Sequence, residues 1–137
     1  MSATGRLNLT VVTPERSVVD RASCEAVSLP GELGELGILP GHTPLVALLG
    51  VGRVSWTDGG RKTAVAVRGG FVEVAGDAVR VLADLAAEKD SIDAAEARQD
   101  RDEGNVRRLN VVGYEQLDSV NADVVFAEAK IAVAQGG

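Results

Sequence analysis

The sequence of 137 residues is poor in the side chains on which most enzymes and nucleic-acid-binding proteins depend. It holds one cysteine (Cys24) and one histidine, and aromatic residues make up only 3% of the chain. A lone cysteine excludes an internal disulfide and a cysteine-rich zinc site. Scarce aromatic rings and a net charge of −6 argue against binding to nucleic acid or to an anionic membrane surface. We therefore expect no metal, no cofactor and no nucleic-acid partner.

Long hydrophobic runs are also missing. Charged residues interrupt the apolar positions of residues 1–20, so we expect neither a signal peptide nor a transmembrane helix. Together with the single cysteine, this pattern favours a cytoplasmic protein that does not insert into a membrane. Apolar residues, mainly Val, Ala and Leu, still make up 45% of the chain. This is enough for the core of one compact domain, with or without an appendage.

Two parts of the sequence differ in texture. Residues 1–88 are rich in valine, glycine and proline, whereas residues 89–137 contain no proline and are rich in alanine and acidic residues. In the first part, short alternating runs are separated by turn signals, among them Asp58-Gly59-Gly60, which predicts antiparallel hairpins. We predict a mixed β-then-α fold. An N-terminal antiparallel β-sandwich or flattened barrel covers residues 1–88, and a C-terminal two-helix antiparallel hairpin covers residues 89–137.

The predicted hairpin has one weak helix and one well-patterned helix. Ser91 is the expected N-cap of the first helix, which runs to about Leu109. The second helix, from about Tyr114 to Ala134, carries an apolar seam at alternating spacings of three and four. The seam consists of Leu117, Val120, Val124, Ala127, Ile131 and Ala134. Neither helix is hydrophobic enough to form a core alone, so the hairpin must pack against another surface.

Candidate catalytic and phosphate-binding patterns are few. His42 has no cysteine or serine partner at a spacing typical of nucleophilic catalysis, so we expect the protein not to be an enzyme. The glycines at 31, 34 and 37 do not form a dinucleotide fingerprint, because no helix is expected directly after them. Gly69-Gly70 could let a ligand approach the backbone, but a β-bulge or a corner of the sandwich is the favoured interpretation.

The most distinctive stretch is residues 29–49, LPGELGELGILPGHTPLVALL. Glycine allows positive φ and proline fixes φ, so this composition predicts a loop that follows a defined path between two strands. Glu35 lies in that segment, where a carboxylate is either a solvated loop tip or a contact for a basic or polar partner.

Four ordered motifs resemble the epsilon subunit family of F-type ATP synthases. The central one is GELGILPGHTPL at residues 34–45, in which Thr43 stands where the family usually has alanine. The other three follow in the family's order at residues 52–54 (GRV), 69–74 (GGFVEV) and 81–93 (VLAD, then ID). The resemblance runs from residue 7 to about residue 97. A β-sandwich followed by a helical hairpin is also the architecture of that family.

The resemblance implies a non-catalytic rotor subunit at the cytoplasmic face of the plasma (inner) membrane. The sandwich would clamp the gamma subunit and rest on the polar loops of the c-ring, coupling its ion-driven rotation to ATP synthesis. By similarity, Glu35, Gly37, Pro40 and His42 lie in the loop that faces the c-ring, while no motif identifies the residues that contact gamma. A fixed loop would present the carboxylate and the imidazole without further ordering cost.

The resemblance also implies that the hairpin is regulatory and can reach the alpha and beta catalytic subunits. Some family members bind ATP through the pattern Ile/Leu-Asp-x-x-Arg-Ala. This chain keeps Ile92 and Asp93 but has Glu96 in place of the arginine, so we predict weak or absent ATP binding. Residues 114–134 carry only Lys130 against four acidic side chains. Because like charges repel, we also predict weak inhibition through contacts with acidic segments of the catalytic subunits.

Two other functions stay open from the residues alone. The chain could be a free-standing β-sandwich binding module that dimerises through the seam of its second helix. It could also be a small-molecule enzyme that uses His42, which would require a deep pocket reaching that side chain.

Overall fold

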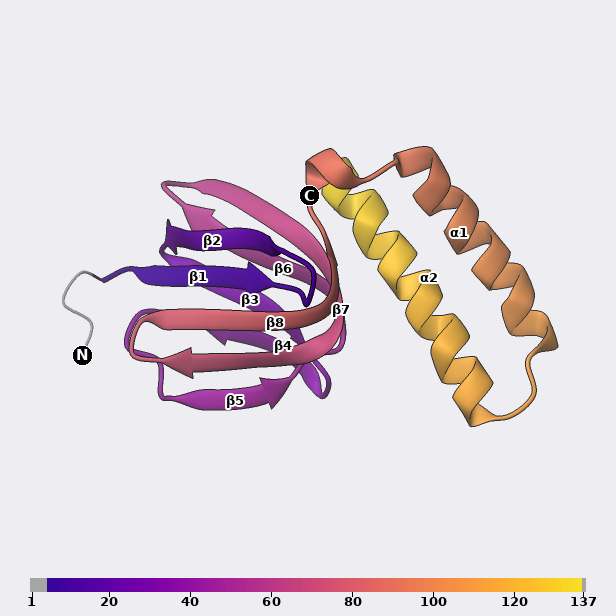
Figure 1. Cartoon of the computed structure of the whole chain (residues 1–137), viewed down its shortest axis with the longest axis horizontal. Coiled ribbons are helices and arrows are strands. Elements are labelled where there is room, and N and C mark those ends of the chain that lie inside the picture. The colour runs from indigo at the N-terminus through magenta and orange to yellow at the C-terminus, as the bar shows by residue number, and fades with distance from the viewer. Residues whose placement is uncertain (1–4, 137) are drawn as a thin grey trace.

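The computed structural model describes residues 5–136, so the first four residues of the predicted sandwich region and the last residue of the predicted hairpin region lie outside it. Eight strands come first and two long helices follow (Figure 1). The strands are β1 (Leu7–Val12), β2 (Ser17–Cys24), β3 (Ala26–Gly31), β4 (Gly34–Ile38), β5 (Leu45–Leu48), β6 (Val51–Asp58), β7 (Arg61–Ala75) and β8 (Ala78–Ala87). The predicted fold class, a β-sandwich followed by a helical hairpin, is confirmed.

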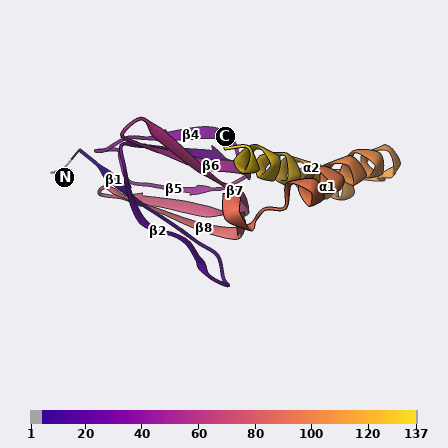
Figure 2. The same cartoon turned by 90° about the horizontal axis from the view of Figure 1, so that it is seen from above.

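The strands form one open sheet that folds over into two layers. Its hydrogen-bonded order is β2-β1-β8-β7-β6-β3-β4, and β5 pairs with β7 outside this path. The first half of β7 pairs with β6 and the second half pairs with β5. One layer therefore holds β4, β3, β6 and the start of β7, and the other holds β5, the end of β7, β8, β1 and β2 (Figure 2). One pair departs from the antiparallel prediction, since β1 and β8 run parallel.

The bend that takes β7 from one layer to the other lies at Gly69 and Gly70. Their φ values are +70° and +109°, a region that side chains disfavour. A β carbon at position 70 would lie 1.9 Å from the carbonyl oxygen of Leu82 in the neighbouring strand. This close approach of two backbones is the corner that the sequence predicted.

The core lies between the two layers. In β1, Leu7, Leu9 and Val11 are buried while Asn8 is exposed, as the alternating pattern predicts. Equivalent inward positions in the other strands include Val27, Leu29, Ile38, Val54, Val65, Val67, Val72, Val74, Val79 and Val81. Each fully buried side chain of this size stabilises the fold by roughly 1.5–3 kcal/mol relative to exposure. The sandwich thus has a core that does not depend on the helices.

The helical region begins with a short 3-10 turn, η1 (Lys89–Ser91), and continues with α1 (Ala94–Arg107). The N-cap of α1 is Asp93, not Ser91 as predicted: the Asp93 carboxylate accepts hydrogen bonds from the Ala95 and Glu96 amides at 3.0 and 3.1 Å. Ser91 belongs to η1, and Ile92 is extended between the two helices. The sequence therefore placed the cap two residues too early, because the 3-10 turn carries no apolar signal of its own.

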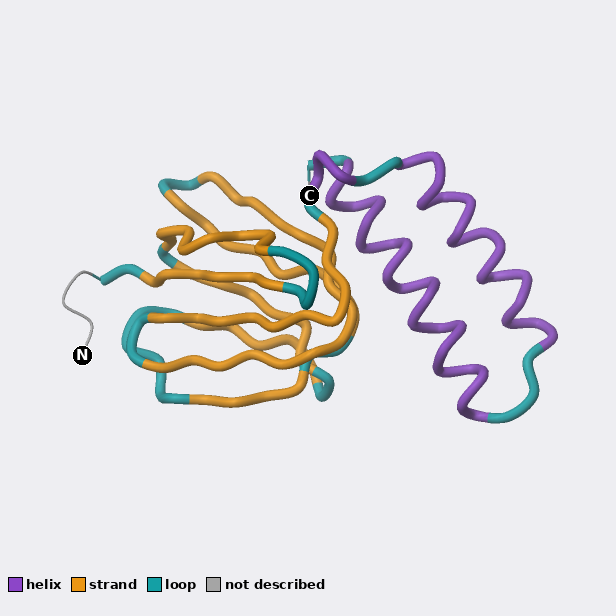
Figure 3. The backbone as a smooth tube through the Cα atoms, viewed as in Figure 1, coloured by secondary structure: helices purple, strands orange, loops and turns teal. Residues whose placement is uncertain are grey.

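The second helix has the bounds that the sequence predicted. After the 3-10 turn η2 (Arg108–Asn110), α2 spans Tyr114–Ala134, and the seam is buried at Val120, Val124, Ala127 and Ile131. The two helices pack against each other as an antiparallel hairpin (Figure 3). Gly104 of α1 is buried where the two helices meet. A β carbon at this position would lie 2.6 Å from the Val124 side chain, so the close packing of the helices requires a glycine here.

Among the described residues, α2 makes the main contact of the hairpin with the sandwich. Ala129 and Val133 are buried against Ala66 of β7, while α1 lies on the far side of α2 (Figures 1 and 2). Since neither helix could form a core alone, this docking is the expected outcome. It leaves α1 supported mainly by its partner helix.

Candidate partner-binding site

Most of the segment that the sequence predicted as a loop is a β-hairpin. β3 ends at Gly31, residues 32–33 form the turn, and β4 returns with Glu35 paired to Pro30. The prediction that Glu35 lies in a loop is therefore wrong. The missed signal is the alternation within β4, where Leu36 and Ile38 turn inward while Glu35 and Gly37 are exposed. The many glycines of the segment concealed this period of two.

Glu35 sits on the outer face of the edge strand β4. Its carboxylate accepts a hydrogen bond from the Ser28 hydroxyl on the adjacent strand and remains exposed. A polar hollow of about 360 Å³ lies beside it, lined in part by Ser28, Arg53, Ser55 and Lys62. The next outward position on β4 is Gly37, which has open space where a side chain would be. The carboxylate is therefore held by a strand and accessible from outside.

The true loop of the segment is residues 39–44, and it contains His42. The His42 amide donates to the Leu39 carbonyl at 3.1 Å, and Gly41 has φ +83° in the third position of this turn, after Pro40. The Gly41 amide also donates to the Asp77 carboxylate at 3.1 Å, which ties the loop to the turn between β7 and β8. The loop is thus held by one hydrogen bond within its own turn and by another to the neighbouring turn.

The imidazole of His42 is partly buried and already engaged. Its Nδ1 lies 2.7 Å from the carbonyl oxygen of Thr43. Because a carbonyl oxygen only accepts, Nδ1 carries the proton and donates this bond, which leaves Nε2 as the nitrogen for a partner.

Glu35 and His42 lie along the same edge of the sandwich but not at one point. Glu35 adjoins the β3–β4 turn, whereas His42 follows the opposite end of β4. At a rise of roughly 3.3 Å per residue, the strand alone separates Glu35 from Ile38 by about 10 Å. The two side chains therefore cannot act on one reacting atom, but the edge that also holds Gly37 and Pro40 can meet an extended partner surface.

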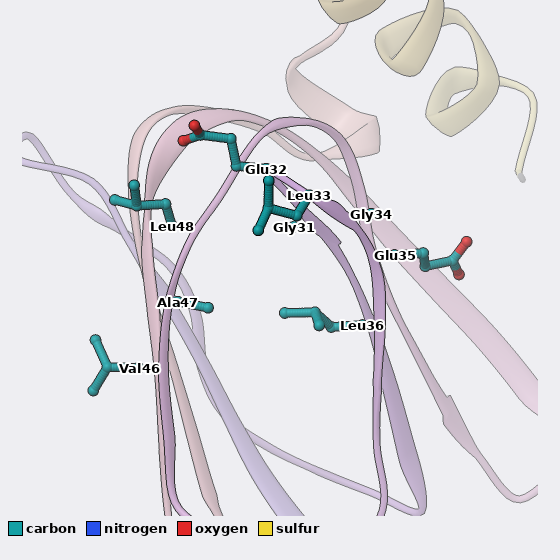
Figure 4. Close-up of a pocket in the computed structure, with 9 residues that line it drawn as sticks. All are labelled: Gly31, Glu32, Leu33, Gly34, Glu35, Leu36, Val46, Ala47 and Leu48. Carbon is teal, nitrogen blue, oxygen red and sulfur yellow. The ribbon is translucent and has the colours of Figure 1, made fainter.

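An apolar groove of about 440 Å³ lies on the other side of the same β-hairpin (Figure 4). Leu33 and Leu36 border it on the β3–β4 side, and Ala47 of β5 points into it from the other side, while Val46 and Leu48 extend from the outer face of β5. Leu33, Val46 and Leu48 are exposed, and large exposed apolar side chains gathered in one place mark interaction sites. This surface was not predicted, although the outward alternation of Val46 and Leu48 in the sequence was a usable signal. Glu35 points away from the groove in Figure 4.

The residues of the family's ATP pattern line a hollow of about 310 Å³ between the helices and η1. Ile92, Asp93 and Glu96 contribute to it, together with Phe126 and Lys130. The Asp93 carboxylate is occupied in capping α1, and the Lys130 ammonium lies 3.8 Å from the Asp100 carboxylate and 4.8 Å from the Phe126 ring centroid. Two carboxylates and one ammonium that is already paired with Asp100 make a poor receptor for a polyphosphate.

Other reactive or ligating groups are sparse in the part of the chain that is described. Burial raises the pKa of the Cys24 thiol, which lies in the sandwich core. Residues 5–136 contain no cluster of three or more His, Cys, Asp or Glu side chains that could hold a metal ion. Among these same residues, no helix combines the length and the apolar character needed to span a bilayer.

Comparison with known families gives a match over residues 6–89 to the model described as ATP synthase, Delta/Epsilon chain, beta-sandwich domain. The chain is 41% identical over 129 residues to the ATP synthase epsilon chain of Solibacter usitatus, covering 93% of this chain and 95% of the relative. It is 42% identical over 129 residues to the ATP synthase epsilon chain of Desulforamulus reducens, covering 94% of each.

Two solved structures share the fold at low identity. One is a chain in the cryo-EM structure of the Euglena gracilis mitochondrial ATP synthase (OSCP/F1/c-ring, rotational state 1), with a TM-score of 0.78 and 19% identity over 98% of this chain and 84% of that one. The other comes from the central stalk/c-ring of the Tetrahymena thermophila mitochondrial ATP synthase, with a TM-score of 0.61 and 16% identity over 90% of this chain and 96% of that one.

Proposed function

The chain belongs to the delta/epsilon family of ATP synthase subunits, and we propose from this membership that it is the epsilon subunit of the central stalk of an F-type ATP synthase. It is a rotor subunit without catalysis of its own. It couples the ion-driven rotation of the c-ring to ATP synthesis in the catalytic head. The observation that carries the proposal is identity of about 40% to epsilon chains over more than nine-tenths of both sequences.

The partners of this role are the gamma subunit and the c-ring. Support comes from the two assemblies that contain chains of the same fold, an F1/c-ring complex and a central stalk/c-ring complex. The protein then sits peripherally at the membrane through its partners, on the cytoplasmic face. We assign the rotor contacts to residues 1–88 and a regulatory role, with access to the alpha and beta subunits, to residues 89–137.

The c-ring contact runs along the β4 edge and the loop after it. Glu35, Gly37, Pro40 and His42 form this contact. Two features favour it. The Glu35 carboxylate is exposed on a strand, and the His42 loop is held by a backbone hydrogen bond within its turn and by the bond from the Gly41 amide to the Asp77 carboxylate. Groups that are already fixed lose little conformational freedom on binding.

The main alternative, a free-standing module that dimerises through the helical seam, requires that seam to be accessible. Instead α1 packs against α2, and four seam positions are buried in the single chain. Dimerisation through the seam would first have to separate the two helices.

A tagged pull-down from detergent-solubilised membranes of the source organism, followed by mass spectrometry, tests the proposal. We expect a gamma-type coiled-coil subunit, the alpha and beta subunits and a small c-type proteolipid to co-elute. Elution alone or as a homodimer would leave only the fold in common with the family.

A further inference from the structure

One carboxylate joins the three main parts of the structure. Asp123 lies on α2, and its Oδ1 accepts a hydrogen bond from the Arg68 guanidinium of β7 in the sandwich. Its Oδ2 accepts from the Arg107 guanidinium of α1 at 3.3 Å. Each carboxylate oxygen therefore serves a different element.

This cluster is partly shielded from water. The side chains of Arg68 and Asp123 are 27% and 31% exposed, and that of Arg107 is 54% exposed. Burial raises the pKa of Asp123, but the hydrogen bonds and charges of Arg68 and Arg107 outweigh this effect and hold its pKa below the ordinary value. The carboxylate is therefore charged at neutral pH, and its partly shielded bonds are stronger than those of a fully solvated pair.

The apolar contact between the hairpin and the sandwich is comparatively thin. Within residues 5–136 it consists of seven side chains, four of which are alanines: Ala64, Ala66, Ala87, Ile92, Phe126, Ala129 and Val133. An alanine buries little apolar surface, and hydrophobic stabilisation is roughly proportional to that surface. Within the described residues, α1 shares no extended contact with any strand. The apolar packing between the hairpin and the sandwich is thus weak for a hairpin of two long helices.

A second ionic contact holds the base of the hairpin in place. Arg16, in the turn after β1, donates two hydrogen bonds of 2.6 Å to the Glu88 carboxylate, directly before η1. The apolar side chains of α2 that contact the sandwich lie at residues 126–133, toward the C-terminal end of the helix, which contacts η1. Asp123 lies one helical turn farther from this base and is the outermost of these contacts.

We propose that Asp123 is an ionic latch, which fixes the helical hairpin on the sandwich through Arg68 and closes the hairpin through Arg107. Docking then depends on this charge and on ionic strength, and it needs no bound ligand. When the latch opens, the far end of the hairpin moves away from the sandwich while the Arg16–Glu88 pair keeps its base attached. The inference concerns the isolated chain and does not rest on the function proposed above.

The test measures the distance between the sandwich and α2 in the full chain. Spin labels on Ser17→Cys in β2 and Ser119→Cys in α2, both exposed positions, report docking by double electron–electron resonance. Cys24 is fully buried and is not expected to take a label. Asp123→Asn and Arg68→Gln each remove one side of the latch. Asp100→Asn is the matched control, because its pair with Lys130 lies within the hairpin.

We expect Asp123→Asn and Arg68→Gln each to increase the population at longer distance about fivefold, the effect of losing roughly one partly exposed ion pair. Asp100→Asn leaves the distribution unchanged. Raising NaCl from about 0.05 M to about 1 M, which shortens the screening length severalfold, shifts the unsubstituted chain in the same direction and does not shift Asp123→Asn further.

Distance distributions of Asp123→Asn and Arg68→Gln that match the unsubstituted chain would overturn the proposal and assign docking to apolar packing alone. Far-UV circular dichroism shows whether the variants keep their helices. If a variant does not fold, the salt titration of the unsubstituted chain decides the matter, and a distribution that is the same at both salt concentrations rejects the latch.

Discussion

At the scale of single residues, the clearest electrostatic anchor is the bidentate pair between Arg16 and Glu88. The hydrogen bonds from Arg16 lower the pKa of Glu88 to about 2, against an ordinary value of 4.5. The two residues are 72 positions apart in sequence, so the pair joins the first turn of the sandwich to the start of the helical region. No spacing rule could have predicted this pair, because it depends on the parallel pairing of β1 with β8.

The lowered pKa of Glu88 predicts an acid dependence of stability. A carboxyl whose pKa is depressed in the folded state stabilises fully above its ordinary pKa of 4.5, and this stabilisation is lost as the pH falls toward 2. Arg16→Gln should therefore lower the melting temperature at pH 7, and the difference from the unsubstituted chain should shrink between pH 4.5 and about 2. Thermal unfolding by circular dichroism across this range measures it.

Arg21→Gln is a suitable control, since the contact of Arg21 with Asp20 is 3.7 Å long and lies on the open surface. We expect it to change the melting temperature little at any pH. A difference between Arg16→Gln and the unsubstituted chain that stays constant from pH 7 to pH 2 would show that the pair does not hold the Glu88 charge.

At the scale of elements, the course of β7 depends on the corner at Gly70. Gly70→Ala introduces a β carbon 1.9 Å from the Leu82 carbonyl oxygen at a φ of +109°. Because the β carbon is fixed rigidly to its own backbone and the oxygen belongs to the neighbouring backbone, the strands themselves must move apart, and we expect a loss of about 3 kcal/mol in the free energy of unfolding. Denaturant unfolding of the full chain tests this.

Gly37→Ala is the matched control for the corner. Gly37 also lies in a strand, but it has ordinary φ and open space at the β-carbon position. We expect its unfolding free energy to stay within about 0.5 kcal/mol of the original. If Gly70→Ala and Gly37→Ala lowered the free energy of unfolding equally, the loss would come from the strand propensity of the residues and not from the corner at Gly70.

The elements also show what sequence could and could not predict. The hairpin turn at Asp58-Gly59-Gly60 was predicted because turn residues are a local signal, and α2 was predicted with its true bounds because its apolar period is local. β4 was missed because its glycines suggested a loop, and the Asp93 cap was missed because a 3-10 turn precedes α1. The Asp123 cluster depends on contacts between segments distant in sequence, which no local pattern encodes. The apolar groove also needs two distant strands, and only the exposure of Val46 and Leu48 follows from a local alternation.

At the start of the helical hairpin, we predict weak or absent ATP binding. Because Glu96 replaces the arginine of the ATP pattern and the Asp93 carboxylate caps α1, we expect millimolar ATP to leave the amide signals of residues 92–97 in place. An NMR titration of the full chain measures this. Glu96→Arg restores the family pattern and should be the variant in which these signals move, if any does. Saturable shifts in the unsubstituted chain would contradict the prediction.

At the scale of the whole molecule, the sandwich and the helical hairpin are held in place by contacts of different extent. The sandwich has a continuous core and an edge strand, β4, paired along its length with β3, whereas the docking of the hairpin depends on a small apolar contact and a few charges. A rotor component needs a rigid body where torque passes through it, and rigid elements position contacting groups more precisely than mobile ones. This difference favours the β4 edge for the proposed c-ring contact and the hairpin for the proposed regulatory role.

This division predicts how Glu35 and His42 act in the assembled enzyme. Glu35→Gln and His42→Ala should lower ATP-driven ion pumping severalfold while ATP hydrolysis stays within about twofold, because the contact transmits rotation and takes no part in the chemistry. Membrane vesicles carrying the variant complex allow both rates to be measured on one sample. Glu15→Gln, an exposed acidic position in the turn after β1, serves as the control and should leave both rates unchanged. If pumping and hydrolysis fall together in the edge variants, the edge supports assembly rather than coupling, and subunit content of the purified complex then shows which subunit is lost.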